Sequence, residues 1–137
     1  MTATAYYRIA AVILALFAAG HTMGFLGFRP NTAEARAVFD GMKTVTMRIG
    51  RATFTYGGFY RGFGLAVTVY LVFSAYLAWH LGTLAASQPL AIGWLAWVFV
   101  AVNAAMLVLS WAYFSMLPAM LSALVTLALA VAALKLP

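Results

Sequence analysis

The sequence predicts an all-α membrane protein: a membrane-spanning up-down four-helix bundle with an interfacial amphipathic helix between the first two spans. Hydrophobic residues make up 66% of the chain and charged residues 7%, against about 45–50% and about 25% in soluble domains. Four apolar stretches are each long enough to cross a bilayer, which takes roughly 20 residues. Short connections between the later stretches make neighbouring helices antiparallel.

The four expected spans cover residues of about 7–28, 59–81, 90–111 and 117–136. Pro89 and Pro118 lie where the third and fourth helices should begin, a position that suits a residue without an amide proton. The tryptophans all fall near span ends, as expected for side chains that prefer the membrane–water interface. We therefore expect one integral membrane domain over residues 1–137.

The long connection between the first two spans predicts an amphipathic helix over about 32–50. Asn31 followed by Glu34 resembles a capping box. At about 100° per residue, an apolar arc opposes a charged one: Ala35, Val38, Phe39, Met42, Val45 and Ile49 against Arg36, Asp40, Lys43 and Arg51. Such a helix lies along the interface, either as a simple lid or as a lipid sensor.

Basic residues predict the orientation. Arg29, Arg36, Lys43, Arg48, Arg51 and Arg61 fall in or beside this connection, whereas Arg8 and Lys135 lie at the other membrane face. The positive-inside rule then places the loop 29–58 in the cytoplasm and both termini outside, unless some arginines serve a binding site. The net charge of +6 is explained by topology and anionic lipid, without a nucleic-acid partner.

A candidate binding site lies at the cytoplasmic end of the predicted bundle. Its imidazole, guanidinium, phenol and indole groups are His21, Arg29, Tyr56, Tyr60, Arg61, Trp111 and Tyr113. Polar groups at membrane depth are costly and often functional. These groups suit a phosphate, a fatty-acid carboxylate or a quinone oxygen on a lipophilic molecule. Alternatively, the arginines extend to the headgroups and His21 bonds a neighbouring carbonyl.

Small residues predict where the first two spans touch. Gly20 and Gly24 form one small-residue series, and Gly58, Gly62 and Ala66 form another. Small residues let membrane helices approach closely. Contact between the two series would bring His21 close to Tyr60 or Arg61.

The sequence offers little for a metal or a cofactor, and we expect neither. His21 and His80 fall near opposite membrane faces, so they cannot ligate one haem within a bundle. The chain has no cysteine, and its only acids, Glu34 and Asp40, lie outside the spans. Proton-coupled export that uses a carboxylate within the membrane therefore lacks its central group.

Two short motifs resemble a family of small uncharacterised bacterial proteins with four transmembrane helices. They are Gly20-His21-Thr22 near the end of span one and Phe59-Tyr60-x-Gly62-Phe63-Gly64-Leu65 opening span two. The resemblance implies the bundle and a location in the bacterial inner membrane. It implies no activity, cofactor or catalytic residue.

Three functions compete. The first is a non-enzymatic membrane protein that binds a lipid or another lipophilic molecule, or packs as an accessory subunit beside a larger partner or a second copy. The second is a lipid- or quinone-modifying enzyme with His21 as acid or base. The third is a channel or exporter, for which no ring of ion-selective side chains is visible. We favour the first.

Overall fold

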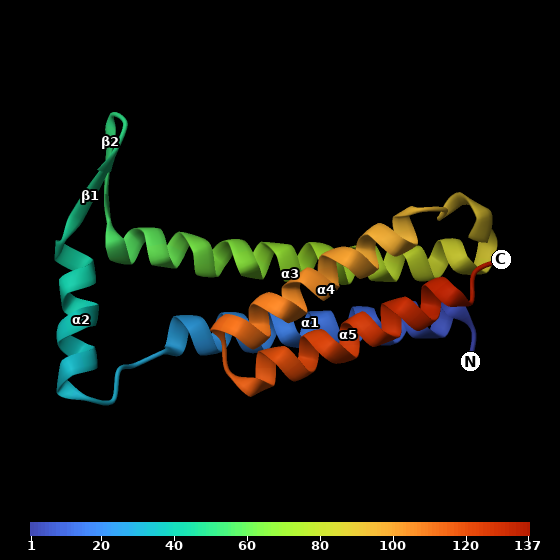
Figure 1. Ribbon diagram of the computed structural model, residues 1–137, viewed down its shortest axis with the longest axis horizontal. Helices are drawn as coiled ribbons and strands as arrows, with labels where there is room; N and C mark the ends of the chain where they lie inside the picture. Colours follow the sequence, from blue (N-terminus) through green and yellow to red (C-terminus); the bar gives the residue numbers. More distant parts are fainter. The chain divides into compact units, whose positions relative to one another are not determined.

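Helices dominate the computed structural model, which describes all residues, 1–137 (Figure 1). The helices are α1 (Ala3–Gly27), α2 (Ala33–Thr44), α3 (Tyr56–Ser87), α4 (Leu95–Tyr113) and α5 (Met116–Leu134). Two short strands, β1 (Thr46–Ile49) and β2 (Ala52–Thr55), separate α2 from α3, and a 3₁₀ turn at Pro89–Ala91 precedes α4.

Four helices, α1, α3, α4 and α5, are long and apolar enough to cross a membrane. They contain 25, 32, 19 and 19 residues. At about 1.5 Å per residue, even the shortest is about as long as the hydrocarbon core is thick. Large apolar side chains on them are exposed, among them Val69, Val108 and Leu127, which suits a lipid environment. The prediction of four helices able to span a membrane is confirmed, and they indicate a multi-pass membrane protein.

The boundary between the second and third spans differs from the prediction. Helix α3 continues to Ser87, and α4 begins only at Leu95. Pro89 opens the 3₁₀ turn instead of α4, and Gly93 then takes a positive φ of 49°. That left-handed conformation is one that glycine adopts without steric cost, so the chain turns there before α4 starts.

The connection between α1 and α3 corrects the all-α prediction. Helix α2 ends at Thr44, and the chain then forms an antiparallel hairpin. The prediction that the helix continues to about residue 50 was therefore wrong beyond Thr44. Threonine and other β-branched residues favour strands, and Gly50 provides the turn with a φ of 59°. The N-cap is Thr32, whose hydroxyl accepts from the Ala35 amide at 3.1 Å, rather than Asn31.

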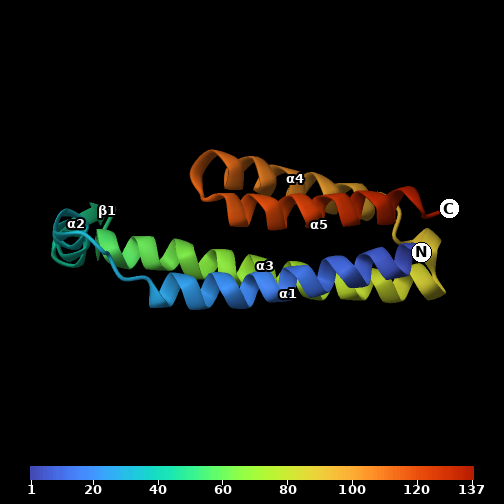
Figure 2. The same ribbon diagram turned by 90° about the horizontal axis from the view of Figure 1, so that it is seen from below.

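The chain divides into two compact units, residues 1–18 with 71–137 and residues 19–70. In the first unit, α4 and α5 lie side by side (Figure 2). Its largest fully buried side chains include Tyr7, Leu14, Leu81 and Leu129. Small residues at buried positions let the helices approach closely; they include Ala10, Ala78, Ala96 and Ala132.

Polar groups in the first unit are bonded between and within helices. Arg8 lies over the ring of Trp79, 3.5 Å from its centroid, and donates to the hydroxyl of Thr83 at 3.0 Å. The hydroxyls of Ser110 on α4 and Ser122 on α5 bond to each other at 3.2 Å. Asn103 donates to the carbonyl of Phe99 on its own helix.

The second unit contains the end of α1, all of α2, the hairpin and the start of α3. Within it, α2 and the hairpin lie crosswise to α3, at the end where α3 begins (Figures 1 and 2). The hydroxyls of Thr22 on α1 and Thr68 on α3 bond at 2.9 Å. This unit positions the candidate site.

Candidate functional site

A pocket of about 740 Å³ lies in the second unit, where the end of α1, one side of α2 and the first turns of α3 meet. Its lining consists of Phe25, Leu26, Phe28, Arg29, Pro30, Arg36, Phe39, Asp40, Met42, Lys43, Thr55, Gly57, Gly58, Tyr60 and Arg61. The volume falls within the range of about 300–1,000 Å³ that is usual for small-molecule sites.

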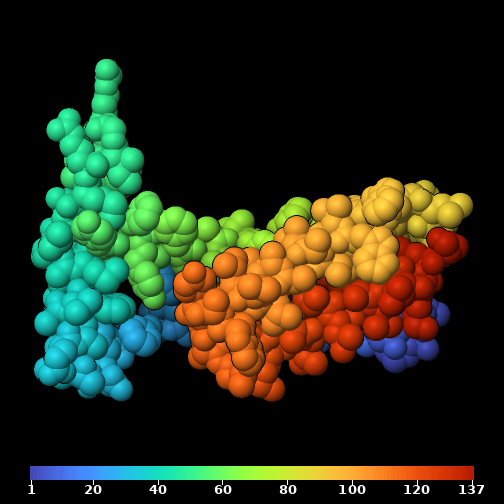
Figure 3. All heavy atoms as spheres, viewed as in Figure 1, coloured from blue at the N-terminus to red at the C-terminus, as the bar shows by residue number.

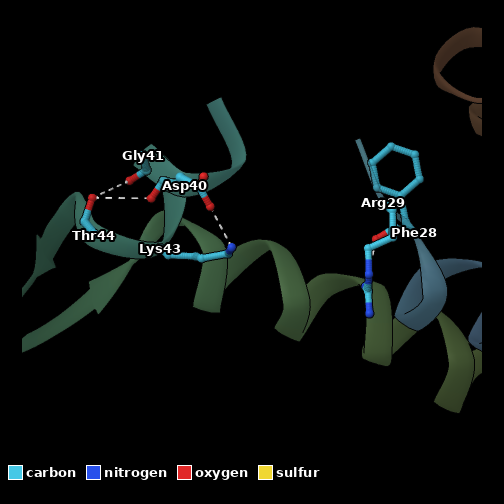
Figure 4. A network of polar contacts seen from close by, with 6 residues as sticks. All are labelled: Phe28, Arg29, Asp40, Gly41, Lys43 and Thr44. Atoms are coloured by element: carbon cyan, nitrogen blue, oxygen red, sulfur yellow. Dashed lines mark hydrogen bonds and ion pairs between the residues drawn. The ribbon is translucent and has the colours of Figure 1, made fainter. Parts of the chain in front are cut away.

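Cations outnumber acids around the pocket. Lys43 donates to Asp40 at 2.7 Å in the only ion pair of the structure (Figure 4). Arg29, Arg36 and Arg61 have no such carboxylate partner. Arg29 donates one N–H to the carbonyl of Phe28 at 3.1 Å, and this bond does not use the other N–H groups of the guanidinium. The pocket therefore presents uncompensated guanidinium groups.

Aromatic rings from three segments form the apolar part of the wall. The ring of Tyr60 on α3 lies 5.4 Å from Phe25 on α1 and 6.2 Å from Phe39 on α2, between centroids. Phe39 in turn lies 5.4 Å from Phe28. These separations are typical of favourable aromatic pairs, so the rings connect α1, α2 and α3 around one apolar surface.

His21 does not form this wall but contacts Phe25, which does. Its Nε2 donates to the carbonyl of Gly64 at 3.0 Å, which fixes the proton on that nitrogen because a carbonyl can only accept. Its ring stacks on Phe25, 5.8 Å between centroids and 7° from parallel. A Cβ at Gly64 would overlap the Phe25 ring. His21 thus supports a residue of the pocket wall and does not line the pocket itself.

Gly64, and not one of the glycines that the sequence pattern indicated, makes room for a neighbouring helix, because the Phe25 ring of α1 packs against it. A Cβ on Gly20, Gly24 or Gly62 would meet no other atom within 4 Å. The predicted contact through these small residues was therefore wrong. The first two spans do bond to each other here, through His21 and Gly64.

The start of α3 adds further positive character. Thr55 caps the helix, because its hydroxyl accepts from the Gly58 amide at 2.9 Å. Gly57 packs against the backbone of Met42, where an added Cβ would lie 3.0 Å from the carbonyl oxygen. Helix N-termini carry a partial positive charge, and residues of this first turn line the pocket.

The structure brings together part of the predicted site. Arg29, Tyr60 and Arg61 line the pocket, and His21 supports it through Phe25. Tyr56 is the first residue of α3 but is absent from the lining.

The two remaining candidates belong to the first unit. Trp111 and Tyr113, at the end of α4, are 71% and 78% exposed. Trp111 lines a separate apolar depression on α4 and α5, together with side chains such as Leu107 and Met120.

Sequence reasoning missed the contribution of α2. Arg36, Phe39, Asp40 and Lys43 all line the pocket, at spacings of three, four and seven residues from the first. Such residues share one side of a helix. This side of α2 lies at the border between its charged and its apolar face. That border is the sequence signal that could have indicated the contribution of α2 to the pocket.

The pocket offers anion chemistry and little for a cation. No group of three or more histidine, cysteine or acidic side chains is placed to hold a metal ion. The planar guanidinium group presents paired N–H donors, which match two oxygens of a carboxylate or of a phosphate. Comparisons with protein-family models, with curated proteins and with solved structures found no match.

Proposed function

We propose that this protein is a small membrane protein that binds the anionic headgroup of a lipid-like molecule in the pocket of the second unit. The observation that carries the proposal is the set of arginines without acidic partners, Arg29, Arg36 and Arg61, beside a wall of aromatic rings. A phosphate or carboxylate matches the arginines, and an acyl or isoprenoid segment matches the rings.

The pocket's location favours an amphiphile over a water-soluble anion. Besides α2, its lining comes from the ends of α1 and α3, two helices that are long and apolar enough to span a membrane. A headgroup there can remain at the interface while its tail stays in the bilayer. We propose that the spans form an up-down bundle in a bacterial inner membrane, with this end in the cytoplasm.

The alternative is an enzyme that uses His21 as acid or base. His21 already donates from Nε2 to the Gly64 carbonyl and is stacked on Phe25. These contacts favour a positioning role for the imidazole. A role as an accessory subunit, beside a larger membrane partner or a second copy, is compatible with headgroup binding.

The test measures lipid retained by the purified protein. Native mass spectrometry would compare phosphatidylglycerol with phosphatidylcholine for the wild type and for the variant Arg36→Gln/Arg61→Gln. A hydrogen bond to a charged group contributes roughly 1.5–3 kcal/mol, so we expect affinity for phosphatidylglycerol to fall about tenfold or more.

The control is Lys135→Gln, which removes a positive charge from a residue that neither lines the pocket nor belongs to the hairpin. In detergent this control should retain phosphatidylglycerol as the wild type does. Equal retention by the pocket variant and the control would overturn the proposal. Inorganic phosphate would be tested as a second ligand. If the wild type binds it and the pocket variant loses both phosphate and lipid, the pocket is a general anion site.

A further inference from the structure

The hairpin between α2 and α3 has two chemically different faces. Residues paired across the ladder point to the same side, and successive residues alternate. The register pairs Met47 with Phe54 and Ile49 with Ala52 on one face. The opposite face carries the pairs Thr46–Thr55 and Arg48–Thr53. One face is therefore apolar and the other is polar and basic.

The apolar face is uncovered at its outer end. Ile49 is 53% exposed and Phe54 is 45% exposed, and the hairpin stands clear of the other elements of its unit (Figure 3). A two-stranded hairpin alone is at best marginally stable in water. An additional surface that covers Ile49 and Phe54 would stabilise it.

The hairpin's attachment places it close to the bilayer. Strand β2 ends at Thr55 and α3, a helix long and apolar enough to span a membrane, begins at Tyr56 with no intervening residue. The hairpin lies crosswise to α3 (Figure 1). An element that lies crosswise to a spanning helix, and is attached to the end of that helix, runs along the membrane surface.

The charge of the hairpin selects the kind of membrane surface. Arg48 and Arg51 flank the Gly50 turn, and the hairpin contains no acidic residue. Neither arginine lines the pocket or has an acidic partner. Basic residues close to a bilayer are attracted by anionic headgroups.

We propose that the hairpin is an interfacial membrane anchor. Its apolar face rests on the acyl boundary, and Arg48 and Arg51 bind phosphates of anionic phospholipids in the bilayer that the chain spans. The strands satisfy each other's inner backbone groups, and the outer edges face hydrated headgroups. This anchor is separate from the pocket and does not depend on the pocket's ligand.

The test uses the absence of cysteine in the chain. Single variants Ala52→Cys and Thr53→Cys place spin labels on neighbouring residues of opposite faces. In phosphatidylglycerol vesicles that hold one protein each, we expect the Ala52→Cys label to collide with oxygen, which concentrates in lipid. The Thr53→Cys label should collide with a water-soluble nickel chelate.

Equal access of the nickel chelate to both labels would overturn the anchor. So would protection of the Ala52→Cys label from both reagents, which would indicate that protein covers this face. Because each label sits in an otherwise wild-type hairpin, neither result depends on a variant that fails to fold.

The lipid charge is tested separately with Arg48→Gln/Arg51→Gln in the Ala52→Cys background. One basic residue near an anionic surface contributes about a fivefold preference. In the wild-type background, the Ala52→Cys label should collide with oxygen more often in phosphatidylglycerol than in phosphatidylcholine vesicles. We expect the variant to lose most of this difference. The pocket variant Arg36→Gln/Arg61→Gln should keep that difference. The anchor can therefore be supported even where the pocket proposal fails, and the two failures can be told apart. An unchanged difference in Arg48→Gln/Arg51→Gln would overturn the role of the arginines.

Discussion

The imidazole of His21 on α1 donates a hydrogen bond to the backbone carbonyl of Gly64 on α3, with 3.0 Å between Nε2 and the oxygen. The bond joins two helices that are long and apolar enough to span a membrane. It also holds the ring against Phe25, which lines the cationic pocket. A histidine near the end of an apolar helix is thus explained by helix pairing, with an indirect effect on the binding surface.

Replacement of His21 by phenylalanine should weaken this pairing. The variant keeps an aromatic ring but has no donor for the Gly64 carbonyl. Hydrogen bonds between membrane helices contribute about 0.6 kcal/mol on average and up to about 1.7, and we expect a loss in that range. Reversible unfolding in mixed detergent micelles would measure it. Wild-type stability combined with complete loss of phosphatidylglycerol would instead indicate that His21 contacts the lipid.

Gly64→Ala should be destabilising, because the new methyl group would overlap the ring of Phe25. Overpacking of this kind costs about 1–3 kcal/mol. Gly62→Ala is the matched control, since a Cβ there meets no other atom within 4 Å. Unfolding of both variants would be compared.

The smaller side chain in Phe25→Leu should recover part of the stability lost in Gly64→Ala. A double-mutant cycle measures this coupling. Additive effects of Gly64→Ala and Phe25→Leu, or equal losses for Gly64→Ala and Gly62→Ala, would contradict the packing described at this contact.

Tyr7→Phe should leave stability unchanged or raise it slightly. The Tyr7 side chain is 1% exposed, and its hydroxyl is buried without a hydrogen-bond partner. A buried polar group without a partner costs about 1–3 kcal/mol, and removing it relieves that cost. Tyr7→Ala, which leaves a cavity, should destabilise the protein strongly. A clear loss of unfolding free energy in Tyr7→Phe would show that the hydroxyl has a partner in the membrane.

The pair Ser110–Ser122 should show measurable coupling between α4 and α5. The hydroxyls bond at 3.2 Å in a buried setting. A double-mutant cycle with Ser110→Ala and Ser122→Ala should give a coupling energy of about 0.6 kcal/mol. If the two single losses add up to that of the double variant, the bond contributes nothing to helix pairing.

Hydropathy alone was enough to predict the four spans, because their apolar residues form long uninterrupted stretches. The hairpin was missed for a physical reason. Val45 and Ile49 fit the apolar arc of a helix, yet alternation of Met47 and Ile49 with Thr46 and Arg48 fits a strand equally well. Gly50 was the feature that could have decided between them.

The candidate site was only partly predictable because position along a span gives depth in the membrane and nothing more. Depth was enough to group Arg29, Tyr60 and Arg61. It also grouped Trp111 and Tyr113, which the structure assigns to the other unit. The pocket side of α2 depends on how that helix rotates against Tyr60, and this rotation is set by ring packing that periodicity does not encode.

The direct junction of Thr55 and Tyr56 joins two parts that face different surroundings. Because no residue separates the two elements, a tilt of the proposed anchor would pass directly to the first turn of α3, where Gly57 and Gly58 border the pocket. Lateral pressure and curvature in the surrounding leaflet would then act as a mechanical input to the arginine-lined cavity.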